Sequence, residues 1–173
     1  MSLFVDIPRE SSKKIRSIRS EMKKIGLANY KKKLDDLIIE DPDFLDPYVY
    51  RINMHRLNDN HAEVIALTEK AALKAKEILG KSRWDKIAHH PNNHHIIEAL
   101  VSEALLDWED EQEDDALQKL NWLYDHLELD EKGCHYMALA IENDINREDF
   151  FKEFPFSDKD RLTKLSIWAK QFN

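Results

Sequence analysis

Histidine is concentrated in one short segment of this chain, where it could bind a metal ion. Four of the eight histidines lie within the segment 89–95, and imidazole nitrogens bind Zn²⁺, Ni²⁺ and Cu²⁺. The ligands of such a site would be His89, His90, His94 and His95. Adjacent histidines without a fixed carboxylate or thiolate partner more often form adventitious sites, since catalytic zinc takes its ligands from rigid elements. We therefore favour the alternative, a polar loop whose asparagines cap the next helix, and expect no cofactor.

The other reactive side chains do not form a catalytic motif. The sequence contains no Gly-rich phosphate loop, no GxSxG and no HExxH. The single cysteine, Cys134, falls on an apolar helical stripe and is expected to be a buried structural thiol. Eight acidic residues lie between Glu103 and Asp115 without a basic one, which is typical of a solvated turn. We expect a protein that is not an enzyme and has no catalytic residues.

Composition predicts a single all-α domain covering residues 1–173. Glycine occurs only 3 times and proline 5 times in 173 residues, whereas β-sandwiches and doubly wound sheets need many tight turns. Long helices joined by few breaks fit this composition better. A single cysteine excludes an intramolecular disulfide and gives no sign of an oxidising compartment.

Charge is distributed unevenly along the chain. Residues 1–33 contain 10 basic and 3 acidic residues, a balance of +7, while residues 34–173 contain 16 and 31, a balance of −15. The acidic body would repel phosphates, so nucleic acid is not expected as a partner. The basic segment 10–27 could meet an anionic membrane or RNA, but it lacks aromatic anchors, and a solvated outer face is the preferred interpretation. Without a signal sequence or an apolar run of ~20 residues, we expect a cytoplasmic protein without membrane contact.

Apolar residues recur at helical spacing in seven to eight segments. The clearest is 116–127, where apolar residues at 116, 120, 123 and 127 form one stripe. Gly26 and the pair Asp41-Pro42 are expected to end helices, because proline cannot continue one. Ser11 or Ser12, Asp46, Asn92 or Asn93, and the segment 157–160 are the expected N-terminal caps. The phenylalanine-rich connector 150–156 is expected to lie on the core.

Two of these segments resemble the second helix of a tetratricopeptide repeat. The matching residues are Tyr30, Leu34, Leu37, Ile38 and Pro42 in one segment, and Ala116, Leu120 and Leu123 in the other. The stretch from Asp115 to Tyr136, with Gly133 before the next helix, is similar to the helix–loop–helix junction of divergent bacterial members. The resemblance implies a right-handed array of antiparallel helix hairpins over 28–142. Segments 10–27 and 143–173 would then cap its ends. A plain irregular helical bundle is the alternative.

The same resemblance implies a non-catalytic scaffold that binds a peptide or partner protein in a concave groove. The candidate partner-binding residues, on the outward sides of two first helices, are Arg51, His55, His94, His95 and Glu98. Two alternatives stay open: a small acidic chaperone similar to those of type III secretion, and a metal-dependent protein built on 89–95. A homodimer is also open, since four tryptophans and seven phenylalanines could leave aromatic surface exposed.

Overall fold

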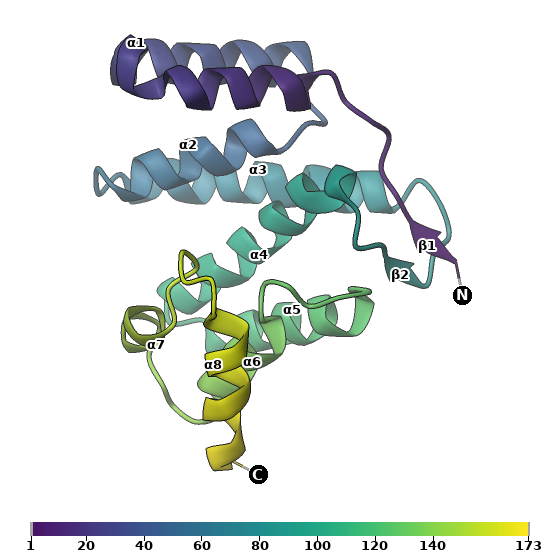
Figure 1. Ribbon diagram of the computed structural model, residues 1–173, viewed down its shortest axis with the longest axis vertical. Helices are drawn as coiled ribbons and strands as arrows, with labels where there is room; N and C mark the ends of the chain where they lie inside the picture. Colours follow the sequence, from purple (N-terminus) through teal and green to yellow (C-terminus); the bar gives the residue numbers. More distant parts are fainter. Residues whose placement is uncertain (1, 173) are drawn as a thin grey trace.

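The computed structural model describes residues 2–172, and helices make up 71% of it (Figure 1). The described α-helices are α1 (Ser11–Glu40), α2 (Asp46–Arg56), α3 (His61–Leu79), α4 (His94–Glu109), α5 (Glu113–His126), α6 (Cys134–Glu142), α7 (Arg147–Glu153) and α8 (Arg161–Trp168). Two short 3₁₀ helices, η1 (Pro91–Asn93) and η2 (Ala169–Phe172), and two strands, β1 (Leu3–Phe4) and β2 (Lys86–Ile87), complete the described elements. The all-α class and the expected number of helices are confirmed. In this part of the chain, no helix is both long and apolar enough to span a membrane.

The first helix, α1, is folded back on itself at Gly26. The backbone there leaves helical geometry at φ 75° and ψ 161°, and the arms 11–25 and 27–40 run antiparallel (Figure 1). Only glycine adopts this region of φ/ψ readily, which confirms the predicted break. The Nζ of Lys33 lies 2.9 Å from a carboxylate oxygen of Glu21, so an ion pair joins the two arms.

Helices α2 to α6 stack in chain order, each packing mainly against the next. The helix α3 lies between α2 and α4, and its alanines Ala71, Ala72 and Ala75 are fully buried, which permits close approach. The helix α2 also contacts α4. The main core runs from Phe4 near one end of the chain to Ala169 near the other, so both ends contribute to it.

A parallel strand pair, absent from the sequence-based expectation, ties the N-terminal segment to the middle of the chain. Leu3 pairs with Lys86 and Phe4 with Ile87, and Ile87 forms a further parallel bridge with Leu127. The sequence pattern predicts no strand in either segment, and the strand pair is therefore a difference from that expectation. Fully buried Ile87 explains the difference, because a strand satisfies its backbone without exposing that side chain.

The expected helix caps are also corrected by the structure. Ser11 begins α1 but its hydroxyl donates to Asp41 of the loop after the helix at 2.9 Å, and Asp46 makes no cap hydrogen bond. Asn93 precedes α4, yet its side-chain amide donates to the carbonyls of Phe4 and Ala88 inside the protein. In the segment 157–160, Asp158 accepts a hydrogen bond from the backbone N–H of Asp160, and α8 begins at the next residue without a side-chain cap. Ser11 and Asn93 form hydrogen bonds with distant segments instead of capping their helices.

The phenylalanine-rich connector lies on the core, as expected. Phe150 and Phe154 are buried and both contact the ring of Trp168, while Trp108 of α4 contacts Phe150 at 5.6 Å between centroids. These contacts hold α7 and α8 against the end of α4 (Figure 1). Phe156 at the end of the connector remains 48% exposed.

Candidate functional site

A groove of about 750 Å³ runs between α2 and α4 on one side and the segment from α7 to α8 on the other. The helices α2 and α4 contact each other, and each also packs against the helix that follows it in the chain. The apolar residues that line the groove are Val49, Val101, Leu105, Phe151, Pro155, Phe156 and Leu162. Its size lies within the range of roughly 300–1,000 Å³ that is usual for ligand sites.

Arg161, at the start of α8, brings a buried positive charge to this groove. Its Nε donates to the carbonyl of Phe154 at 2.9 Å and its Nη1 to the carbonyl of Lys132 at 2.7 Å. Its Nη2 is buried and has no hydrogen-bond partner, and among residues 2–172 no carboxylate forms an ion pair with this guanidinium. The group lies over the ring of Phe156, with Cζ 4.3 Å from the ring centroid. Burial lowers the pKa of Arg161, although the charge of Asp130 acts in the opposite direction.

Two further arginines of the lining, Arg56 and Arg147, share one carboxylate. The Nε of Arg56 lies 3.1 Å from Glu109 and the Nη2 of Arg147 lies 3.5 Å from the same oxygen. Arg56 Nη2 and Arg147 Nε are buried without hydrogen-bond partners. Burial lowers the pKa of Arg56, partly opposed by the charge of Glu109. The lining thus contains three arginines, of which Arg56 and Arg147 share Glu109, and each of the three has a buried nitrogen without a hydrogen-bond partner among the described residues.

Three of the four acidic residues of the lining already have a basic side chain as partner. Glu98 pairs with Lys132, Asp158 with Lys164 at 2.6 Å, and Glu131 with His89 at 2.8 Å. The remaining lining charges include exposed Lys159 and exposed Glu148. None of these lining carboxylates forms an ion pair with Arg161.

The predicted partner-binding residues are divided among different places. Glu98 lines the groove. Arg51 is buried and forms an ion pair with Asp35 of α1, and its Nη2 lies 3.1 Å from the Nε2 of His55. Burial, followed by the charge of Arg51, lowers the pKa of His55. His55 lines a separate hollow of about 480 Å³ against the Gly26 turn, so it and Arg51 do not share a groove with Glu98.

His95, predicted both as a partner contact and as a metal ligand, is an internal structural residue. Its Nδ1 accepts from the backbone N–H of Leu45 at 3.2 Å, and its Nε2 donates to Asp6 at 3.0 Å. Asp6 also accepts from Arg9 at 2.9 Å. Burial raises the pKa of Asp6, but hydrogen bonds from His95 and Arg9 outweigh it and lower this pKa to about 2. Both ring nitrogens of His95 are thus used inside the protein, Nδ1 by the loop before α2 and Nε2 by the N-terminal segment.

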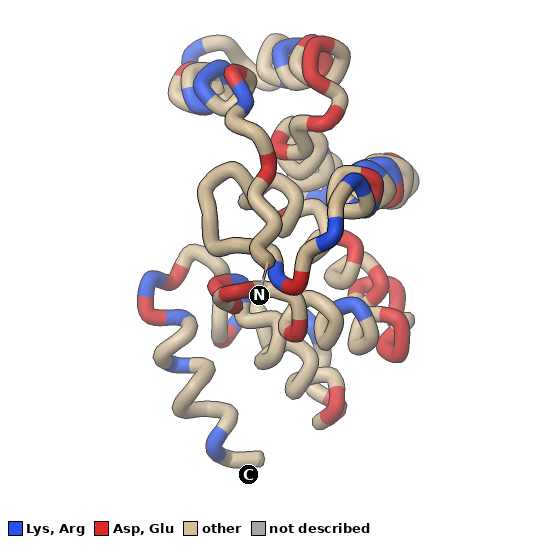
Figure 2. Tube along the Cα trace, turned by 90° about the vertical axis from the view of Figure 1, so that its right-hand side faces the viewer, with Lys and Arg blue, Asp and Glu red and all other residues tan. Residues whose placement is uncertain are grey.

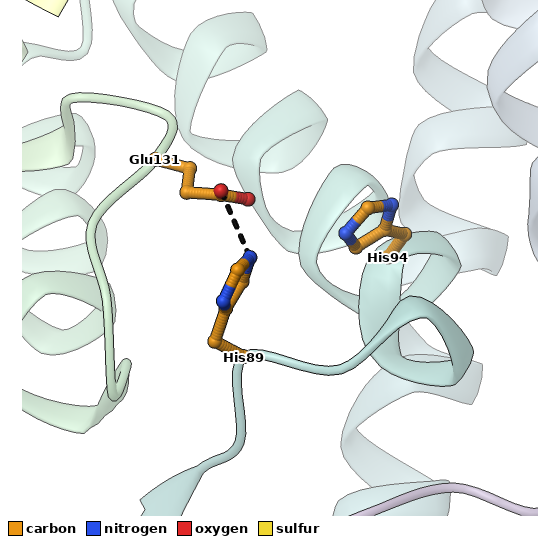
Figure 3. A group of neighbouring side chains, drawn as sticks. All are labelled: His89, His94 and Glu131. Carbon is orange, nitrogen blue, oxygen red and sulfur yellow. Dashed lines mark ion pairs between the residues drawn. The ribbon is translucent and has the colours of Figure 1, made fainter.

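The predicted histidine cluster is split by the structure. His90 caps η1, where its Nδ1 accepts from the backbone N–H of Asn92 at 3.2 Å. His89 and His94 come together at the surface, and Glu131 from the loop between α5 and α6 joins them (Figure 3). Two of the four predicted ligands therefore meet, with a carboxylate that lies 42 and 37 positions away from them.

The arginines of the groove were not found from the sequence. Positions 161, 165 and 168 share the buried side of α8, so an arginine on an otherwise apolar stripe was the available signal. Arg56 is the last residue of α2, where basic residues are common, and Arg147 is the first residue of α7, and nothing in the sequence distinguishes either of them. Comparisons with protein-family models, with curated protein sequences and with solved structures found no match to this chain.

Proposed function

We propose that this chain is a non-catalytic interaction module that holds an extended segment of a partner protein in the groove between α2, α4 and α8. The observation that carries the proposal is Arg161, a buried guanidinium without a carboxylate partner beside an apolar groove. A buried charge without an ion-pair partner is unfavourable, and an anionic ligand would add to the distant charge of Asp130 in stabilising it. The groove opens onto the exposed faces of Phe156 and Leu162, which are 48% and 38% exposed.

The partner segment should place an acidic side chain next to an apolar one. The carboxylate would pair with the arginine side of the groove, made by Arg56, Arg147 and Arg161. The apolar side chain would pack on Phe156 and Leu162. A hydrogen bond to a charged group contributes about 1.5–3 kcal/mol, so the arginine contact would set much of the specificity.

A peptide-display selection on the intact protein tests this proposal. We expect the enriched peptides to combine Asp or Glu with an apolar residue. The variant Arg147→Gln keeps a polar side chain at a half-buried position and should weaken their binding about tenfold or more, as expected for losing a charged hydrogen bond. Arg83→Gln removes an exposed arginine outside the groove and serves as the matched control. Enriched peptides without acidic residues, or equal binding to both variants, would refute the proposal.

A further inference from the structure

Three side chains from separate loops and helices converge at the surface formed by β2, α4 and the loop between α5 and α6. His89 follows β2, His94 is the first residue of α4, and Glu131 lies between α5 and α6. Figure 3 shows them turned toward a common space, with an ion pair between His89 and Glu131. We propose that His89, His94 and Glu131 form a binding site for one divalent transition-metal ion of the zinc class.

The ligand atoms are close to the geometry that such an ion needs. One nitrogen from each histidine and one oxygen of Glu131 all lie within 4.8 Å of one another, and His89 Nε2 is 2.8 Å from Glu131. Tetrahedral ligands with bonds of about 2.0–2.1 Å lie roughly 3.3–3.5 Å apart. All three side chains are exposed, so rotation about their own bonds can close the remaining gap without moving the backbone.

The two loops that carry His89 and Glu131 are held in fixed register. The backbone N–H of Glu128 donates to the carbonyl of Ile87 at 2.9 Å, and the backbone N–H of His89 donates to the side chain of Glu128 at 2.7 Å. Lys132, the neighbour of Glu131, also lies beside the cluster, but its ammonium group pairs with Glu98 of α4. Ligands on such braced elements are better defined than those on an isolated histidine run.

A small hollow lies beneath the three ligands. It has a volume of about 20 Å³, and its apolar lining comprises Ile87, Ala88, Ile97, Leu127 and Leu129. A water needs at least about 10–15 Å³ of such space, so an ion with three protein ligands would keep room for one more small ligand. Two imidazoles and one carboxylate with an open position are a common ligand set for Zn²⁺, whereas Mg²⁺ and Ca²⁺ prefer oxygen ligands alone.

Calorimetric titration tests this site on the whole 173-residue chain, purified without a histidine tag and freed of metal by a chelator. We expect one equivalent of Zn²⁺ to bind, Mg²⁺ not to bind, and the thermal midpoint to rise with Zn²⁺. His94→Ala and Glu131→Gln should each lower the affinity on the order of 10- to 100-fold or more. The control His61→Ala removes another exposed histidine, at the start of α3, and should leave binding unchanged.

Several outcomes would overturn the metal site. One is weak binding of more than one equivalent of Zn²⁺. Another is an equal loss of Zn²⁺ affinity in His61→Ala and His94→Ala. Circular dichroism of each variant without metal verifies that it is folded, since all the substituted residues are exposed. Glu131→Gln tests the site independently of the histidines, because the substitution keeps the shape of the side chain and removes its charge. The result is independent of peptide binding in the groove.

Discussion

Asp6 and His95 are 89 positions apart, yet a carboxylate oxygen of Asp6 accepts a hydrogen bond from His95 Nε2 at 3.0 Å inside the protein. Arg9 donates to the same carboxylate, and its Nη1 continues to Asp41 at 2.8 Å. The N-terminal segment, the end of α1 and the start of α4 are therefore joined by one polar network. The strand pair between β1 and β2 continues this connection, so the first ten residues act as a brace between the α1 hairpin and the rest of the chain.

The Asp6 network predicts acid sensitivity. The folded state lowers the pKa of Asp6 from 3.8 to about 2, although burial alone would raise it. This stabilisation is fully present above pH 4 and is lost as the pH falls from about 4 to 2, amounting to about 2 kcal/mol. Asp6→Asn should therefore reduce the free energy of unfolding at pH 7 much more than at pH 2, as measured in urea. Asp36→Asn, at an exposed position, should show no such pH dependence.

Two glycines with positive φ should respond differently to alanine. At Gly26 an added Cβ meets nothing within 4 Å, so Gly26→Ala should destabilise through backbone strain alone, by about 1–3 kcal/mol. At Gly133 the Cβ would also lie 3.2 Å from Arg161 Nη1 and 3.4 Å from Leu165. Gly133→Ala should therefore lower both stability and peptide affinity, whereas Gly26→Ala should lower stability only. Thermal melts and peptide-binding assays on both variants distinguish the effect on stability from the effect on affinity. A loss of peptide affinity in Gly26→Ala would contradict the placement of the binding groove away from Gly26.

Cys134 should be unreactive in the folded protein. It is fully buried at the start of α6, and burial, followed by the charge of Asp130, raises the pKa of its thiol. Because the thiolate is the reactive form, an aromatic disulfide reagent at pH 8 should label it only on unfolding. Labelling at the same rate in native and urea-unfolded protein would show that the α6 packing is not as described.

The core of α5 offers a direct test of the packing. Leu120 is fully buried within the main core, and Leu120→Ala should destabilise by about 2–5 kcal/mol. Leu57, after α2, is 86% exposed, and the same truncation there should change the free energy of unfolding by less than about 0.5 kcal/mol. Chemical denaturation of both variants compares them, and similar losses would place Leu120 outside the core.

Helix periodicity was sufficient to predict the all-α class and most of the helices. The stripe at 116, 120, 123 and 127 is buried throughout, and the breaks at Gly26 and Asp41-Pro42 fall where the chain reverses or leaves α1. Strand β1 was not predictable in the same way, because a two-residue strand has no periodicity and its partner lies 83 positions away. The predicted N-terminal caps at Ser11 and Asn93 were wrong for a related reason. Both side chains form hydrogen bonds with segments that are distant in the sequence, and a local sequence pattern does not reveal such partners.

The sites depended even more on tertiary structure. The segment 89–95 identified His89 and His94, but Glu131 joins them only because the loop after α5 runs beside β2. For His95 the sequence was misleading, because its position in the histidine-rich segment predicted a surface residue. In the structure it is buried and forms hydrogen bonds with Asp6 and Leu45. The positions of His94 and His95 around the axis of α4 could have distinguished them from the sequence. His95 lies on the buried side of this helix, together with Ala99 and Ser102.

The charge distribution along the sequence does not predict where the groove arginines lie in the structure. Basic residues are prominent on the α1 hairpin, while acidic residues gather around the ends of α4 and α5 (Figure 2). The arginines proposed to bind a partner, Arg56, Arg147 and Arg161, belong to the acidic body rather than to the basic segment 10–27. The overall charge of −8 therefore does not describe the groove.

Nuclear magnetic resonance of the arginine side chains tests the central claim most directly. The protein, labelled with ¹⁵N in arginine, would be titrated with a short peptide that alternates glutamate with leucine, and with its glutamine counterpart. We predict that the Nε–H signals of Arg147 and Arg161 shift with the glutamate peptide only, while that of Arg51, paired with Asp35 near α1, stays in place. Unchanged signals from the two groove arginines, or equal shifts with the glutamine peptide, would contradict the proposal that this groove recognises an acidic segment.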